Sequence, residues 1–285
     1  MNIQDRLETR EIMPGFGVEI LNIDVRHAKA DLRNQLVQLF NQYGALLIRN
    51  QNLENPEDMM DLATIFGPPE DHTQKQFTLP GYPKIYLLSN RKKDGRPIGA
   101  HFDGVGWHTD YSYIAEPVKQ TMVHAIEVPP EGGDTIIADL CAAYDALSEE
   151  RKKQLDGLIV HHSYKFFMET REHGRKKLSK EMAEQNPDVF HPLILTHPEN
   201  GRKALWVSTG TVKEIVGMPN PEGLQLMDQL VEFATQEKFT YRHKWQVGDV
   251  VTWDNRRTLH TGTLFDDAKY IRYAYRLWIK GDKPV

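Results

Sequence analysis

Histidine and an acidic residue recur two positions apart in this sequence, a spacing that suits a bound metal ion. On an extended chain, residues i and i+2 point to the same side of a strand, so both side chains can reach one ion. Three segments have this spacing: His101-x-Asp103, His108-x-Asp110 and His197-x-Glu199. About one such match is expected by chance in a chain of this composition, so the neighbouring residues must decide among them.

The middle pair has the most favourable context. The first pair lies in the glycine-rich stretch GAHFDGVG, and HPENG around the third is typical of a turn. His108 and Asp110 instead open WHTDYSYIAEP, where aromatic neighbours can hold them on a strand. His260, just after VVTWDNRRTL, is the candidate third ligand. Two histidines and one carboxylate leave three positions open, as non-haem iron(II) oxygenases require, whereas a structural His–Asp hydrogen bond is the alternative.

Two arginines near the C-terminus indicate an anion partner. In YIRYAYRLWI, Arg272 and Arg276 would share one face of a strand. A buried guanidinium is costly unless it is paired, so the pair suggests a ligand with a carboxylate or a nearby acid. A solvated edge strand is the alternative. Thr135 follows the turn GGD and would begin the strand DTIIADL, from which it could help Arg272 to bind a dicarboxylate.

The elements that must position these residues are mostly strands. Hydrophobic periodicity predicts helices over 31–43 and 56–66, and short apolar runs between 84 and 140 indicate strands. Helical patterns interrupt the strands around 142–235. Strands then return, with FTYRHKW and VVTWDN predicted as a hairpin around VGD. The pattern favours a mainly β fold with flanking helices, a β-sandwich or jelly roll. We expect residues 1–285 to form a single domain with that helical insertion.

Composition excludes several classes of function. A formal net charge of −5 over 285 residues provides no cationic face for nucleic acid. The N-terminus lacks a secretory apolar region, and no run approaches the roughly 20 apolar residues of a membrane span. The single cysteine, Cys141, excludes an internal disulfide and fits a reducing compartment. We therefore expect a cytoplasmic protein without a nucleic-acid or membrane partner.

Longer blocks resemble a known family. They are FGPPEDH (66–72), WHTDYSY (107–113), PPEGGDTIIADLCAAYDALS (129–148), THPENGRKAL (196–205), and FTYRHKWQVGDVVTWDNRRTLHTG followed by RYAYR. In this order they resemble the taurine dioxygenase / 2,4-dichlorophenoxyacetate dioxygenase family of iron(II)- and 2-oxoglutarate-dependent oxygenases. The resemblance implies a double-stranded β-helix, a cupin-like jelly roll. It also implies iron ligands at His108, Asp110 and His260, with Thr135 and Arg272 holding the distal carboxylate of 2-oxoglutarate.

The resemblance also implies a reaction. Dioxygen would oxidise 2-oxoglutarate to succinate and carbon dioxide while a small anionic substrate is hydroxylated, with ascorbate as a stimulant. Aryloxyalkanoates, sulfonates and other carboxylates are the expected substrates. Arg276 would face both the cosubstrate and the acidic group of the substrate, and His72, His162 and His197 would lie near the substrate. Family members commonly self-associate, so we expect a homo-oligomer.

Three questions stay open at this level. The basic residues of one segment could attract an anion to a lid or form a solvated face: Lys165, Arg171, Arg175, Lys176 and Lys177. A metal-dependent hydrolase or isomerase on the same fold is an alternative enzyme, but it leaves Thr135 and Arg272 without a role. A ligand-binding jelly roll without catalysis is the other alternative.

Overall fold

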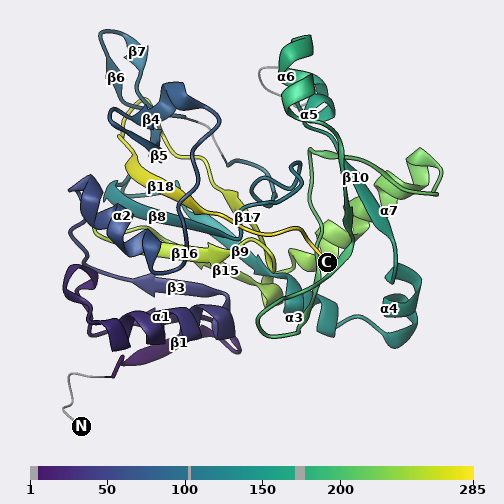
Figure 1. Cartoon of the computed structure of the whole chain (residues 1–285), viewed down its shortest axis with the longest axis horizontal. Helices are drawn as coiled ribbons and strands as arrows, with labels where there is room; N and C mark the ends of the chain where they lie inside the picture. The colour runs from purple at the N-terminus through teal and green to yellow at the C-terminus, as the bar shows by residue number, and fades with distance from the viewer. Residues whose placement is uncertain (1–5, 102–103, 171–176) are drawn as a thin grey trace.

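The largest layer of the protein is a sheet of eight strands (Figure 1). A computed structural model describes residues 6–101, 104–170 and 177–285. In spatial order the strands are β1 (Thr9–Met13), β2 (Phe16–Ile20), β3 (Ala45–Ile48), β16 (Val250–Asp254), β8 (Gln120–Glu127), β18 (Tyr273–Ile279), β5 (Tyr82–Ser89) and β4 (Thr78–Leu79). Only β2 and β3 pair in parallel within this sheet. The mainly β fold predicted from the sequence is confirmed.

A smaller sheet faces the large one across a shared core. Its order is β15 (Thr240–His243), β9 (Thr135–Asp139) and β17 (Thr258–Gly262). Ile137 of β9 is fully buried in one cluster with Val123 of β8 and Val251 of β16. Figure 1 shows β9, β15 and β17 beside the central strands of the large sheet. This shared core therefore supports β9 and β17 from the side that faces the large sheet.

The predicted hairpin between FTYRHKW and VVTWDN is wrong. β15 pairs with β9 in the small sheet, whereas β16 pairs with β3 and β8 in the large one. The turn between them carries the chain from one sheet to the other. A close approach fixes this turn, because a Cβ atom on Gly248 would lie 3.0 Å from the carbonyl oxygen of Gln51. Alternating hydrophobicity identified both strands, but it contains no information about their partners.

Two early helices cover the outer face of the large sheet. They are α1 (Ala30–Tyr43) and α2 (Pro56–Thr64), and their buried residues share a core with Ile85 and Leu87 of β5. Asn55 caps α2 by accepting a hydrogen bond from the backbone N–H of Glu57, and Pro56 is the first helical residue. Gly44 ends α1 with φ of 75°. None of the helices in the described ranges is long and apolar enough to cross a membrane.

The segment expected as a helical insertion also contains strands. Its elements are α3 (Leu140–Asp145), α4 (Glu149–Leu155), β10 (Ile159–His162), α5 (Tyr164–Thr170), α6 (Lys180–Gln185), β11 (Val189–Pro192), β12 (Ile194–Thr196), β13 (Lys203–Leu205), β14 (Val212–Ile215) and α7 (Asn220–Ala234). The strands form the sheets β11-β10-β14 and β12-β13. Strands of three or four residues are too short for a clear periodic signal. Leu205 and Leu230 of this segment pack with Leu259 of β17, so the segment covers the outer face of the small sheet.

Short elements complete the described chain. They are the 3-10 helices η2 (Val25–His27), η3 (Lys75–Phe77) and η4 (Glu237–Phe239), and the hairpin strands β6 (Lys92–Lys93) and β7 (Arg96–Pro97). The hairpin pairs Lys92 with Pro97 and projects from the β4–β5 end of the large sheet in Figure 1. These elements connect larger ones, and Val25 of η2 and Phe239 of η4 are buried in the core.

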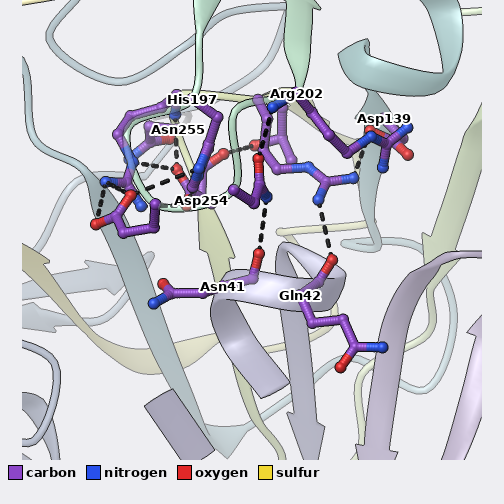
Figure 2. Close-up of polar contacts among 12 residues, drawn as sticks. Asn41, Gln42, Asp139, His197, Arg202, Asp254 and Asn255 are labelled. Carbon is purple, nitrogen blue, oxygen red and sulfur yellow. Dashed lines mark hydrogen bonds and ion pairs between the residues drawn. The ribbon is translucent and has the colours of Figure 1, made fainter. Parts of the chain in front are cut away.

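A buried ion pair fixes the turn that leads from β16 into β17. The guanidinium of Arg257 is fully buried, and it donates hydrogen bonds to Asp139 Oδ1 (2.9 Å) and to the carbonyl oxygen of Gln42 (3.3 Å; Figure 2). Gly44 leaves room for it, because a Cβ there would lie 2.8 Å from Arg257 Nε. The pair thus joins α1, β9 and the β16–β17 turn.

We expect Asp139→Ala to lower the free energy of unfolding by about 3–5 kcal/mol, because it leaves a buried charge without its partner. Urea denaturation followed by circular dichroism measures this change. Asp145→Ala is the matched control, since its ion pair with Arg202 is largely exposed and such pairs contribute at most about 1 kcal/mol. Equal losses in the two variants would contradict a structural role for the buried pair.

Candidate metal and cosubstrate site

Three side chains from two distant parts of the sequence meet at the β17 edge of the small sheet. His108 and His260 form an antiparallel bridge in which each backbone N–H donates to the other's carbonyl oxygen at 2.9 Å. His108 Nε2 lies 3.6 Å from Asp110 Oδ1, and His260 Nε2 lies 3.8 Å from Asp110 Oδ2. One ligand atom from each residue lies within 4.8 Å of the others, and no other group of this kind is found among the described residues.

The segment that holds His108 and Asp110 is not the regular strand that we expected. It meets β17 through isolated bridges at Val105–Gly262 and His108–His260, and the hydroxyl of Thr109 donates to the carbonyl oxygen of Thr258 at 2.8 Å. The segment then turns, with Tyr111 at a φ of 57°. The backbone pairing with His260, rather than a local strand, therefore sets the position of His108. This pairing explains how two ligands on a loop can be held at a fixed distance from β17.

The protonation states suit metal binding. The carbonyl oxygen of Gly106 lies 2.7 Å from His108 Nδ1, so this nitrogen carries the proton and Nε2 offers a lone pair. Burial, assisted by His108, lowers the pKa of His260 to about 3. Burial alone would raise the pKa of Asp110, but His260 and His108 hold it well below its usual range. The site therefore offers the neutral imidazole of His260, Nε2 of His108 and the carboxylate of Asp110, which are ligands for a divalent transition metal.

A cavity on one side of His260 contains the predicted anion partners. Thr135, Arg272 and Arg276 line it together with His260. Its other walls are apolar, formed by Leu88, Val123 and Trp253. The predicted alternation along β18 is confirmed: Ala274 packs in the core between the sheets, whereas Tyr275 and Leu277 pack beneath α1 and α2. The cavity thus contains the guanidinium of Arg272 and the hydroxyl of Thr135 as well as His260. One carboxylate of a dicarboxylate could bind Arg272 and Thr135 while its other end lies near His260.

Trp245 orients the hydroxyl of Thr135. Its indole Nε1–H donates a hydrogen bond to Thr135 Oγ1 at 3.1 Å. This bond uses a lone pair of the oxygen, so the hydroxyl proton can be donated to an acceptor in the cavity. The contact was not predicted from the sequence, because it depends on the pairing of β15 with β9.

A second pocket opens on the other side of the three residues. His108, Asp110 and Arg276 line it, and His72 lies in its wall. The remaining lining is rich in aromatic side chains: Trp107, Tyr111, Tyr113, Tyr164, Phe167 and Trp278. Trp107, Tyr111 and Tyr113 belong to the block WHTDYSY, but nothing in the sequence indicated that they line a pocket. Two pockets therefore meet at the candidate metal site.

His72 and Arg276 form a polar corner of this second pocket. The imidazole of His72 stacks between Tyr86 and Trp278, with ring centroids 3.7 Å and 4.0 Å away. Burial, with Arg276 nearby, lowers the pKa of His72 to about 2, so the ring is neutral at neutral pH. The backbone N–H of Gln74 donates to Nδ1 at 3.0 Å, so the proton lies on Nε2, 3.3 Å from Arg276 Nη2. Two donors this close suit an acceptor that bridges them.

Comparison with known proteins agrees with this geometry. The family described as "Taurine catabolism dioxygenase TauD, TfdA family" matches residues 8–278. The chain belongs to this family. It is 33% identical over 267 residues to the α-ketoglutarate-dependent 2,4-dichlorophenoxyacetate dioxygenase of Cupriavidus pinatubonensis, covering 89% of this chain and 91% of the relative. It is 37% identical over 238 residues to the (S)-phenoxypropionate/α-ketoglutarate dioxygenase of Sphingobium herbicidovorans, covering 79% and 78% of the two chains.

A solved structure agrees over the whole chain. The crystal structure of AAD-2 in complex with Mn(II) and N-oxalylglycine superposes with a TM-score of 0.82 at 28% identity, covering 98% of this chain and 99% of that one. The family resemblance predicted from the sequence blocks is confirmed. The protein is a 2-oxoglutarate-dependent dioxygenase, an enzyme of the oxidoreductase class.

Two histidines expected near the substrate lie elsewhere in this TauD/TfdA-family dioxygenase. His197 is buried, and its Nε2 lies 2.9 Å from Asp254 Oδ2 (Figure 2). His162 lies behind the pocket wall, with Nδ1 3.0 Å from the hydroxyl of Thr211, which does line the pocket. Neither residue is part of the pocket lining, so a role for them beside the substrate stays a prediction. Their sequence positions gave no information about side-chain direction.

The remaining sequence candidates lie apart from the pockets or beyond the described ranges. His101 pairs with Asp267 at 2.8 Å, which gives it a structural partner. Asp103 of the same motif falls outside the residues that the structure describes, as do Arg171, Arg175 and Lys176 of the basic segment. Lys165 and Lys177 are exposed and line neither pocket, which agrees with a solvated position for these two lysines.

Proposed function

We propose that His108, Asp110 and His260 bind Fe(II), and that 2-oxoglutarate occupies the cavity beside His260. The observation that supports this most strongly is the meeting of three donor atoms within 4.8 Å next to a cavity that contains Arg272 and Thr135. A hydrolase or isomerase would leave the cation and the oriented hydroxyl without a role. Both are explained if they bind the far carboxylate of a diacid.

The iron, when bound, would supply the redox chemistry by which dioxygen oxidises 2-oxoglutarate to succinate and carbon dioxide and hydroxylates the substrate. Arg272 and the hydroxyl of Thr135 would hold the distal carboxylate. The apolar walls formed by Leu88, Val123 and Trp253 exclude water and strengthen this charge interaction. His108 and Asp110 line the second pocket, so a substrate there would meet the metal from the opposite side.

The second pocket supports a small anionic substrate with an aromatic ring. Arg276 and the Nε2–H of His72 together offer donors to a carboxylate or sulfonate. The aromatic side chains around them suit a flat apolar group by stacking and edge contacts. The two relatives are named for phenoxy acids. We therefore propose an aryloxyalkanoate or a related carboxylate or sulfonate as the substrate class.

We further propose that the two facing sheets form a double-stranded β-helix, or jelly roll, and that the chain is one domain with an insertion around 142–235. The crossing from β15 to β16 between sheets supports this topology. Cytoplasmic location, self-association and the absence of nucleic-acid or membrane partners remain predictions from the sequence. Burial raises the pKa of the Cys141 thiol to about 12, so this cysteine is unreactive.

The test of this function is a pair of measurements. Purified protein mixed anaerobically with Fe(II) and 2-oxoglutarate should develop a visible absorption band. With oxygen and ascorbate, phenoxyacetate should stimulate succinate release more than methoxyacetate, which has the same ether and carboxylate without the ring. A panel of sulfonates, amino acids and other carboxylates would extend the comparison. If 2-oxoglutarate neither binds nor perturbs the metal site, the assignment is wrong.

A further inference from the structure

Only one oxygen of Asp110 is left to bind a metal. Its Oδ2 accepts two hydrogen bonds from protein donors, one from the hydroxyl of Thr121 at 2.5 Å and one from the indole Nε1–H of Trp278 at 2.9 Å. Two donors occupy the two lone pairs of a carboxylate oxygen. Oδ1, which lies 3.6 Å from His108 Nε2, is therefore the oxygen on the metal side.

The direction of each hydrogen bond can be worked out from Asn255. The amide Nδ2 of Asn255 can only donate, so the Thr121 oxygen accepts from it and the single proton of the Thr121 hydroxyl points to Asp110 Oδ2. This Nδ2 lies 2.9 Å from Thr121 Oγ1. The chain of donors runs from Asn255 through Thr121 to Asp110.

Asn255 is held rigidly at the start of this chain. It is buried in the turn that follows β16, beside Asp254 (Figure 2). Its backbone N–H donates to the carbonyl oxygen of Lys119 at 2.9 Å, and its own carbonyl accepts the indole N–H of Trp206 at 2.9 Å. Thr121 is fully buried on β8, which pairs with β16. Thr121 is therefore fixed by the large sheet and Asn255 by the turn that follows β16, and neither depends on the loop that contains Asp110.

We infer that Thr121 and Asn255 are positioning residues that restrict Asp110 to binding the metal through Oδ1 alone. This inference rests on the proposed metal site. If the carboxylate turned and bound through both oxygens, it would occupy one of the three positions that cosubstrate and dioxygen need. The two residues thus preserve the open side of the site, and they touch neither the metal nor the substrate.

Cobalt(II) binding to the metal-free protein tests the role of Thr121. Thr121→Val keeps the shape of the side chain and removes the donor, and we expect about 10–100-fold weaker binding, as for other partners of metal ligands. The visible spectrum of bound Co(II) should also change, because it responds to the number of ligand atoms. Thr121→Ser keeps the hydroxyl and should bind like the unmodified protein.

Thr252→Val is the matched control. Its hydroxyl is equally buried on the neighbouring strand and donates to the backbone carbonyl of Thr121 at 2.8 Å, but it does not touch Asp110. We expect it to keep the Co(II) affinity and spectrum. Circular dichroism of the metal-free variants confirms that each compared protein is folded.

Asn255→Leu tests whether the chain of donors acts through Thr121. Alone, it should weaken Co(II) binding in the same direction as Thr121→Val, because the hydroxyl loses the donor that orients it. In the Thr121→Val background it should have no further effect on affinity. If Thr121→Val binds Co(II) as Thr252→Val does, or if Asn255→Leu has the same effect in both backgrounds, the inference is wrong. If His108→Ala still binds Co(II) normally, the proposed metal site itself is wrong.

Discussion

His108→Ala abolishes succinate release from 2-oxoglutarate if His108 is a metal ligand. The change removes one of three donors that lie within 4.8 Å of one another. Loss of a partner that only orients a ligand costs about 10–100-fold in metal affinity or activity, and loss of the ligand itself should cost more. The measurements are succinate release with phenoxyacetate and the iron content after equilibration with Fe(II). The anaerobic absorption band should also be lost.

His101→Ala is the control for this experiment. It removes the histidine of the competing His-x-Asp motif, whose side chain pairs with Asp267 in the structure. We expect it to retain iron and succinate release. The opposite pattern, with iron lost from His101→Ala and kept by His108→Ala, would show that the wrong motif was chosen.

The parts of the site that follow local rules could be predicted from the sequence. The i, i+2 spacing put His108 and Asp110 within reach of one ion, and the alternation expected for an extended chain put Arg272, just before β18, and Arg276 in the same cavity. His260 is different, because no local rule joins it to His108 across 150 residues. It was chosen for its place just after the predicted strand VVTWDN, and the order of the family blocks supported that choice. The structure explains the meeting by the backbone bridge between the two histidines.

The parts that depend on strand pairing could not be predicted. Trp245 reaches Thr135 only because β15 pairs with β9, and Asn255 reaches Thr121 only because β16 pairs with β8. Hydrophobic alternation states which face of a strand is buried, but not which strand lies next to it. The wrong hairpin and these missed hydrogen-bond donors therefore have the same cause.

His197 shows a limit of the family resemblance itself. It falls in one of the matching blocks, THPENGRKAL, yet its imidazole points to Asp254 and not into the pocket. Arg256 donates to the same carboxylate and to Glu199, so His197 belongs to a buried charged cluster. A block that matches the family can thus contain residues with a structural role as well as residues of the active site. The direction of each side chain in the structure shows which role applies.

Arg272→Ala should raise the concentration of 2-oxoglutarate needed for half-maximal rate by at least about 30-fold. Truncating one partner of a buried, hydrogen-bonded charge pair costs about 2–5 kcal/mol, and each 1.4 kcal/mol is a factor of about ten. The rate at saturating 2-oxoglutarate should fall much less, because Arg272 would hold the distal carboxylate and not the end at the metal. Titration of the anaerobic absorption band with 2-oxoglutarate gives the same affinity without turnover.

Arg91→Ala separates this effect from a general loss of positive charge. Arg91 lies near the start of β18, over the ring of Tyr273 and paired with Glu127, but it does not line the cavity. Its removal should leave the 2-oxoglutarate requirement unchanged. Arg272→Lys should fall between the two variants, since an ammonium keeps the charge but loses the forked pair of donors that matches a carboxylate. If Arg272→Ala lowered only the maximal rate, Arg272 would act at the metal end, and the orientation of 2-oxoglutarate in the cavity would have to be reversed.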